Sequence, residues 1–199
     1  MNNAHRFALW ALSVAATAIL ADITNSGPYY IDMEAFEPCD DIGTLGINFE
    51  VRLTVDSDNN TVYEGDLTFP YDLSDPEMTS SLLVDRWGST GGWGRMYNLT
   101  EKDMFTYMKL NFPNVFEAFY GSFGVTGPPA PAGKYSMKHF FPLNLKLQKM
   151  ASLMYGRFKL KYLQFKDGED LGCLQAVFRV NEDAPGKQRG TLAASHMDR

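Results

Sequence analysis

Two stretches of the chain alternate apolar and polar residues with a period of two. In the first, residues 46–55, the apolar positions are Ile47, Phe49, Val51, Leu53 and Val55. Because successive side chains of a strand point to opposite faces, this pattern predicts a strand with one buried face. The alternation resumes after a polar turn at residues 56–60 and continues to Pro70, so a β-hairpin is expected here.

The second alternating stretch predicts another hairpin near the carboxyl end. Phe158, Leu160 and Tyr162 alternate with lysines, and the apolar set then shifts by one residue at Leu163, which predicts a β-bulge in this strand. Residues 166–170 are typical of a turn, and alternation returns between residues 174 and 180. The two hairpins indicate a mainly antiparallel β fold.

The middle of the chain departs from this pattern. Thr100 followed by Asp103 is typical of a helix N-terminus, and apolar residues at helical spacing follow, so one short helix is expected to end near Asn111. Residues 112–133 are rich in aromatic side chains and end in several prolines, which predicts an irregular segment. Two interpretations of this segment are open: ordinary core, or a mobile aromatic lid over an apolar cavity.

The amino-terminal residues have the character of a secretory signal peptide. Arg6 precedes an uninterrupted apolar run at residues 7–20, and a cleavage site is expected after Ala21. The run is shorter than the roughly 18–20 residues that a membrane-spanning helix needs, so a single-pass anchor is the weaker alternative. We expect one secreted domain over residues 22–181 and a flexible tail over residues 182–199.

Composition and the predicted signal peptide limit the possible partners and covalent modifications. The 199 residues carry a formal charge of −6, which argues against nucleic acid as a partner because phosphate backbones attract clustered cations. In an oxidising compartment Cys39 and Cys173 are expected to form a disulfide, the alternative being two buried free thiols. Asn59 and Asn98 each begin an N-glycosylation triplet.

A search for catalytic residues predicts no enzyme, cofactor or metal site. The chain has 3 histidines; His5 lies in the signal peptide and His196 in the tail, and His139 is interpreted as a structural residue near a strand edge. No G-x-S-x-G motif and no metal-ligand spacing is present. The pair Asp40-Asp41 is interpreted as a solvated turn, and Gly91-Gly92-Trp93-Gly94 as a bend that exposes Trp93.

Three segments resemble the ganglioside activator family, whose members belong to the ML-type lipid-recognition proteins. The segments are Gly133-Lys134-Tyr135-Ser136, Tyr155-Gly156-Arg157-Phe158-Lys159-Leu160 and Asp167-Gly168-Glu169-Asp170-Leu171-Gly172-Cys173-Leu174, in the family's order and spacing. The resemblance implies a β-cup of two antiparallel sheets that holds acyl chains, an aromatic loop at its mouth, and pairing of the first and last cysteines. The family's central cysteines have no counterpart here, and in this the chain is similar to divergent insect members associated with contact chemosensation.

The expected function is that of a secreted, non-enzymatic carrier of a lipid or another hydrophobic small molecule. The candidate ligand contacts are Trp87, Trp93, Tyr97, Phe105, Met108, Phe112, Phe116, Phe119, Tyr120 and Phe123. A lipid-processing enzyme or a membrane receptor is a further candidate partner. A carrier of this kind could also contact a membrane transiently. Lysosomal delivery is an alternative destination to secretion. Two other interpretations stay open: a protein-binding accessory factor, and a structural or storage protein.

Overall fold

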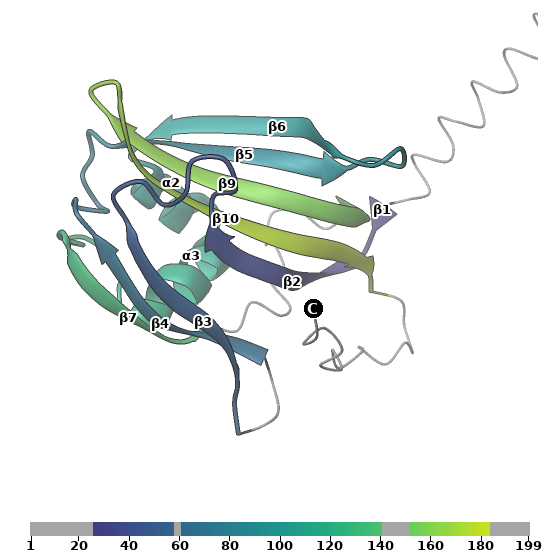
Figure 1. Ribbon diagram of the computed structural model, residues 1–199, viewed down its shortest axis with the longest axis horizontal. Coiled ribbons are helices and arrows are strands. Elements are labelled where there is room, and N and C mark those ends of the chain that lie inside the picture. The colour runs from purple at the N-terminus through teal and green to yellow at the C-terminus, as the bar shows by residue number, and fades with distance from the viewer. Residues whose placement is uncertain (1–25, 58–60, 141–151, 184–199) are drawn as a thin grey trace, which may run out of the picture.

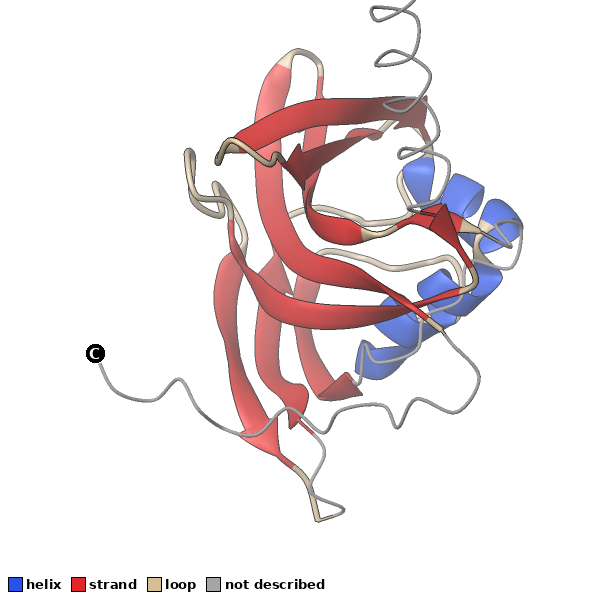
Figure 2. Ribbon diagram, turned by 90° about the vertical axis from the view of Figure 1, so that its right-hand side faces the viewer, coloured by secondary structure: helices blue, strands red, loops and turns tan. Residues whose placement is uncertain are grey.

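The computed structural model describes residues 26–57, 61–140 and 152–183. It is mainly β, with antiparallel strands in two principal sheets (Figures 1 and 2). The larger sheet has the order β2 (Tyr29–Pro38), β10 (Glu169–Glu182), β9 (Gly156–Lys166), β5 (Thr79–Trp87) and β6 (Trp93–Lys102). The smaller has the order β3 (Asn48–Val55), β4 (Thr61–Phe69) and β7 (Gly133–Phe140), and a short ribbon joins β1 (Ser26–Gly27) to β8 (Leu153–Met154). The expected two-sheet antiparallel class is therefore confirmed.

Several predicted features lie outside the described residues. These are the signal peptide, Asn59 and all of the predicted tail beyond Asp183. Strand β10 continues to Glu182, one residue past the end that the alternation predicted for the domain.

Both predicted hairpins are confirmed. Strands β3 and β4 pair from Asn48 opposite Thr68 to Val55 opposite Thr61. Strands β9 and β10 are joined by the two residues Asp167 and Gly168, whose φ angles of 53° and 85° are both left-handed. Two-residue turns of this kind match the twist of the flanking strands, and Asp-Gly is a preferred sequence for them.

The prediction of a β-bulge in β9 is wrong, because the bulge lies in the neighbouring strand β10. Strand β9 pairs without interruption through Leu163 and Gln164, and the extra residue is Leu171 on the opposite strand β10. The apolar pattern along β9 changes because Gln164 occupies an inward position, where its side chain accepts a hydrogen bond of 2.7 Å from the Tyr71 hydroxyl. A satisfied buried amide thus interrupts the apolar alternation without a change of face.

The predicted short helix is present as α2 (Met104–Asn111), but it begins three residues later than a Thr100 cap would place it. The N-cap is Asp103, whose carboxylate accepts a hydrogen bond of 3.1 Å from the amide of Thr106. Thr100 lies in β6. The end near Asn111 is confirmed.

The prediction that residues 112–133 are irregular is wrong in their first half. A second helix, α3 (Pro113–Tyr120), and a 3-10 turn, η1 (Gly121–Phe123), follow α2 directly. Pro113 occupies the first turn of α3, where a proline's missing amide proton costs no hydrogen bond. Figure 2 shows these helices along one side of the two sheets.

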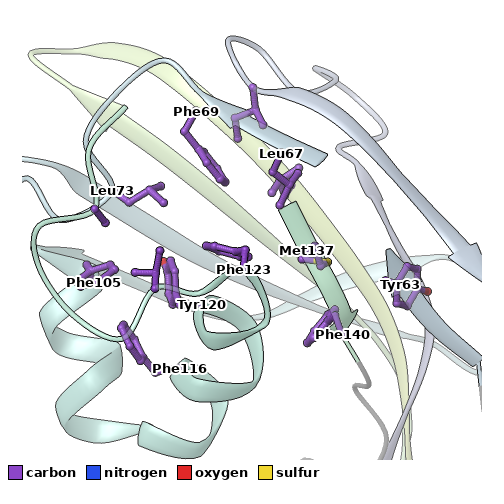
Figure 3. Packing of buried hydrophobic residues seen from close by; sticks show 14 residues of the cluster. Tyr63, Leu67, Phe69, Leu73, Phe105, Phe116, Tyr120, Phe123, Met137 and Phe140 are labelled. Carbon is purple, nitrogen blue, oxygen red and sulfur yellow. The ribbon is translucent and has the colours of Figure 1, made fainter. Parts of the chain in front are cut away.

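The main core lies between the sheets and the helices. It is a single apolar cluster of 14 buried residues: Ile47, Tyr63, Leu67, Phe69, Leu73, Phe105, Phe116, Tyr120, Phe123, Val125, Ala130, Met137, Phe140 and Leu174. Figure 3 shows the helix residues of this cluster gathered near Leu73, and Met137 and Phe140 along β7. Helices α2 and α3 are thus part of the core and not an appendage to it.

The disulfide is confirmed. Cys39 follows the last residue of β2 and Cys173 lies in β10, with their Cα atoms 5.8 Å apart and a sequence separation of 134. Both are buried, and no free cysteine is found in the described part of the chain. The bridge fastens the edge strand β2 to the strand beside it.

Candidate ligand-binding site

The inner face of the larger sheet carries apolar side chains that are only half-buried. Leu160 on β9 lies opposite Ala176 on β10 and opposite Val84 on β5, and all three are partly exposed. Leu82 continues the row on β5. Because Leu174, on the same face of β10, belongs to the main core, these side chains point between the two sheets.

This half-buried row separates two buried clusters. The second cluster consists of Tyr29, Ile31, Phe158 and Val180. Along β10 the inward positions run from Leu174, in the main core, through Ala176 to Val180 in the second cluster. The described chain therefore packs tightly at both ends of this face and less completely in its middle. We define the candidate site as this row: Leu82, Val84, Leu160 and Ala176.

An aromatic cluster lies beside the row, around Phe36 on β2, which is the strand partner of Ala176 on β10. Phe36 contacts the rings of Phe49, Tyr63, Phe119 and Phe140 at centroid distances of 5.4–6.0 Å. Phe36 and Phe119 are themselves half-buried against the main core. Sequence reasoning missed Phe36 and the other inward residues of β2. The alternation of Tyr29, Ile31 and Met33 could have predicted this strand. An extra residue at Glu34 shifts the register, so that Phe36 does not follow Met33 with a period of two.

The ten predicted ligand contacts fall into three groups. Four are fully buried in the core: Phe105, Phe116, Tyr120 and Phe123. Three are half-buried on the two helices or between them: Met108, Phe112 and Phe119. The remaining three, Trp87, Trp93 and Tyr97, lie on β5 and β6. For the first group the packing matches the ordinary-core interpretation, because their rings already contact other core rings, such as Phe105 against Phe116 at 4.9 Å.

The two tryptophans pack on the outer face of the larger sheet. Trp87 and Trp93 form an edge-to-face pair with ring centroids 5.1 Å apart. Arg157 lies over both rings, and Lys159 lies 4.9 Å from the centroid of Trp93. The prediction that the glycine bend exposes Trp93 is wrong, because these cations cover the ring and Trp93 is half-buried. Trp87 is the more exposed of the pair, at 44%.

A chain of neutral polar groups fastens α3 to the inner face of the sheet. The hydroxyls of Tyr120 and Tyr162 lie 3.3 Å apart, and Ser80 donates to Tyr162 over 3.3 Å. Burial raises the pKa of Tyr120 and Tyr162, and it raises that of Tyr71 beside Gln164 as well. These phenols stay protonated at physiological pH, so the chain contributes hydrogen bonds to the interior without adding charge.

The Asp40-Asp41 pair is not a purely solvated turn. Asp40 bonds to the ammonium groups of Lys159 and Lys161 at 2.6 and 2.7 Å, and Asp41 bonds to Lys161 at 2.8 Å. The side chains of the two lysines are only 7% and 11% exposed. Hydrogen bonds from Lys159 and then Lys161 lower the pKa of Asp40 from 3.8 to about 2. The turn therefore neutralises two buried cations on the outer face of β9.

Replacing Asp40 by Asn should destabilise the protein by about 1–2 kcal/mol at neutral pH. Loss of one partner of a fully buried pair costs about 3–5 kcal/mol, and the half-exposed position of Asp40 reduces this. Since folding lowers the pKa of this carboxylate, its contribution is complete above pH 3.8 and disappears as the pH falls towards 2. Urea unfolding at several pH values measures the difference.

The matched control for this prediction is Asp41→Asn. Asp41 is 60% exposed and shares only Lys161, so its loss should cost less than about 1 kcal/mol. Equal effects of the two substitutions, or an Asp40→Asn effect that persists unchanged to pH 2, would contradict the assignment of Asp40 as the principal partner.

A separate open depression of about 480 Å³ lies in the segment that was predicted as a lid. It is lined by residues between Phe123 and Tyr135, most of them glycine, proline or small. Its lining comes from this one segment of the chain, whereas the half-buried row comes from three strands of the larger sheet.

Among the described residues, no three His, Cys, Asp or Glu side chains are grouped as metal ligands would be. The backbone of His139 lies in β7, at the edge of the smaller sheet, while its side chain lies outside what the structure describes.

None of the helices in the described ranges combines the length and apolar character needed to cross a membrane.

The architecture is that of an antiparallel β-sandwich with a partly open apolar interior. Comparison with known proteins gives no match to any family model and none to any curated protein.

Proposed function

We propose that this protein is a secreted, non-enzymatic carrier that holds a lipid or another hydrophobic small molecule between its two sheets. The observation that carries the proposal is the half-buried row of Leu82, Val84, Leu160 and Ala176 between two fully buried clusters. Covering such a surface with an apolar ligand yields about 25 cal/mol per Å² removed from water, less the costs of association and ordering.

The absence of charge along this row supports an apolar ligand. The inward neighbours of Leu160 on both adjacent strands are aliphatic, and the nearest polar chain, at Tyr162 and Ser80, is neutral. The nearest charged group on this face is Arg86, the next inward residue of β5 after Val84, and it donates a hydrogen bond of 3.1 Å to the carbonyl of Tyr155 at the end of the row. We therefore place the apolar portion of the ligand along the row.

The resemblance to the ganglioside activator family supports the same function. The two-sheet antiparallel fold and the Cys39–Cys173 bridge are features that this resemblance implies. The disulfide and the predicted signal peptide support release into the extracellular space, with lysosomal delivery as the alternative destination. The similarity to cysteine-poor insect members makes a hydrophobic chemical cue a second class of cargo.

A protein-binding accessory factor is the second candidate. Its support is the set of exposed apolar side chains near the β5–β6 connection: Trp87 on the outer face, Tyr97 on the inner face and Met96 at the bulge are 44%, 55% and 50% exposed. Large exposed apolar side chains that gather at one end of a sheet are candidates for contact with a protein or a membrane. A lipid-processing enzyme or a membrane receptor is the partner class for this function.

A large side chain placed in the candidate site should weaken ligand binding while the protein still folds. We expect Ala176→Trp to weaken binding of a dansyl-labelled fatty acid roughly tenfold or more, because the indole occupies the space between the two clusters. Lys138→Trp is the matched control, since Lys138 is an exposed residue on β7 and its side chain points away from the interior. Fluorescence titration measures binding, and the melting temperature checks folding.

Two results would count against the carrier. One is an Ala176→Trp protein that binds the probe like wild type. The other is wild-type protein, purified from its natural source, that shows no bound mass in native mass spectrometry, yields no lipid on extraction and does not bind the probe. If the wild-type protein carries no lipid and does not bind the probe, but does bind a protein partner, the accessory-factor function would be favoured.

A further inference from the structure

Among the described residues, strand β6 forms a free edge of the larger sheet. In the sheet order it is the last strand, and within the described ranges it pairs with β5 alone. Figure 1 shows β6 along the upper border of the molecule. An unpaired edge presents a row of amide and carbonyl groups to which a strand of another chain can add, so proteins usually protect such edges.

A β-bulge and charged side chains, which commonly protect an edge strand, cover only part of this edge. The register between β5 and β6 shifts at Met96, and this bulge disturbs the segment nearest Trp93. From Tyr97 to Lys102 the pairing with β5 is regular, and the charged residues Glu101 and Lys102 stand at its far end. Four consecutive uncharged residues, Tyr97 to Thr100, therefore begin the regular part of the free edge, with Tyr97 55% exposed.

Asn98 lies in this unprotected stretch and carries the acceptor triplet Asn98-Leu99-Thr100. Its side chain is exposed and points to the outer face, away from the candidate ligand site, because Tyr97 and Leu99 occupy the inward positions. Thr100 donates a hydrogen bond of 3.3 Å to Asn98 Oδ1, and its hydroxyl lies 2.7 Å from that of Ser81. With Ser81 donating to Thr100, the chain of bonds engages the side chain of Asn98 through its oxygen, and the residue is exposed.

We propose that Asn98 is an N-glycan attachment site whose glycan covers the free edge of β6 and keeps the protein monomeric. In the modification, Nδ2 of Asn98 bonds to the anomeric carbon of an oligosaccharide carried on a polyprenyl diphosphate. The polyprenyl diphosphate leaves and Nδ2 loses one proton. A bulky, hydrated group in the middle of the edge then prevents a second strand from reaching the backbone of β6. This inference rests on the secretion that the proposed function includes, and not on ligand binding.

The test is expression in a eukaryotic secretory host of wild type, Asn98→Gln, Asn98→Lys and Thr100→Ser. Peptide mass mapping after amidase treatment should show Asn98 converted to Asp in wild type and in Thr100→Ser, which keeps the triplet. Light scattering should show both proteins monomeric. Asn98→Gln should self-associate with at least a doubling of apparent mass as concentration rises, whereas Asn98→Lys, equally free of glycan, should stay monomeric because a lysine protects the edge.

Two results would overturn the proposal: a secreted wild type without a glycan at Asn98, or an Asn98→Gln protein that remains monomeric at every concentration. Binding of the dansyl-labelled fatty acid by the same preparations separates this failure from a failure of the carrier function. A secreted protein that binds the probe but lacks the glycan overturns the edge proposal alone, whereas a glycosylated protein that binds no probe overturns the carrier alone. A wild type that stays inside the cell without a glycan overturns both the edge proposal and the secretion on which it rests.

Discussion

Replacing Cys39 and Cys173 together by Ala is expected to lower the free energy of unfolding by about 5 kcal/mol. The bridge closes a loop of 134 residues, and in the chain-entropy account the stabilisation grows with loop length through the entropy that the unfolded chain loses. A loss of this size approaches the whole stability of an ordinary domain, so the variant should be largely unfolded near 37 °C. Urea denaturation followed by circular dichroism measures the change.

The control for the disulfide is reduction of the wild-type protein. Denatured but unreduced wild type should give no reaction with a thiol reagent, and denatured, reduced wild type should react and show the same loss of stability as the double variant. A double Ala variant that unfolds at the wild-type urea concentration would contradict the expected contribution of the bridge. In that case the contacts between β2 and β10 would hold the edge of the sheet without covalent help.

Replacing Phe105 by Ala is expected to destabilise the protein by about 3–5 kcal/mol. Phe105 is 2% exposed, and its ring contacts Phe116 and Tyr120 at 4.9 and 5.0 Å, so truncation leaves a cavity among core rings. Phe119→Ala is the matched comparison. Its side chain is half-buried, so we expect a smaller loss of about 1–2 kcal/mol together with weaker binding of the dansyl-labelled fatty acid.

This pair of variants separates core from ligand-contacting aromatics. Chemical denaturation gives the stability of each variant, and probe titration at a temperature where both are folded gives the binding. The folded fraction of Phe105→Ala should bind the probe like wild type. Weak binding by Phe105→Ala with unchanged stability would show instead that the helices behave as a lid, and that their buried rings meet the ligand.

The hairpins could be predicted from sequence because their information is local. Alternation with period two fixes which face of each strand is buried, and Asp167-Gly168 provides the left-handed conformations that the turn requires. The disulfide was also within reach of sequence reasoning, since a chain with two cysteines and an export signal has one pairing available.

The helical segment was harder to predict because its signals are ambiguous. Pro113 ends one helix and begins the next, and a proline near a helix boundary is compatible with either role. The aromatic side chains that follow are equally typical of a core and of a ligand site. Their burial against Leu73 and Phe69 depends on strands that are distant in sequence, which no local pattern reveals.

By itself, the sequence determined the β class, the two hairpins, the presence and the end of α2 and the partners in the disulfide, because each depends on a short-range pattern or on a single available pairing. Only the tertiary structure decided which aromatic residues are core, that Gln164 and Lys159 are buried, and that Leu160 and Ala176 lie in an incompletely packed row. Burial of this kind depends on which strands become neighbours, and that order, β2-β10-β9-β5-β6, joins segments more than a hundred residues apart. The physical reason is that periodicity assigns a side chain to a face, whereas long-range packing determines what covers that face.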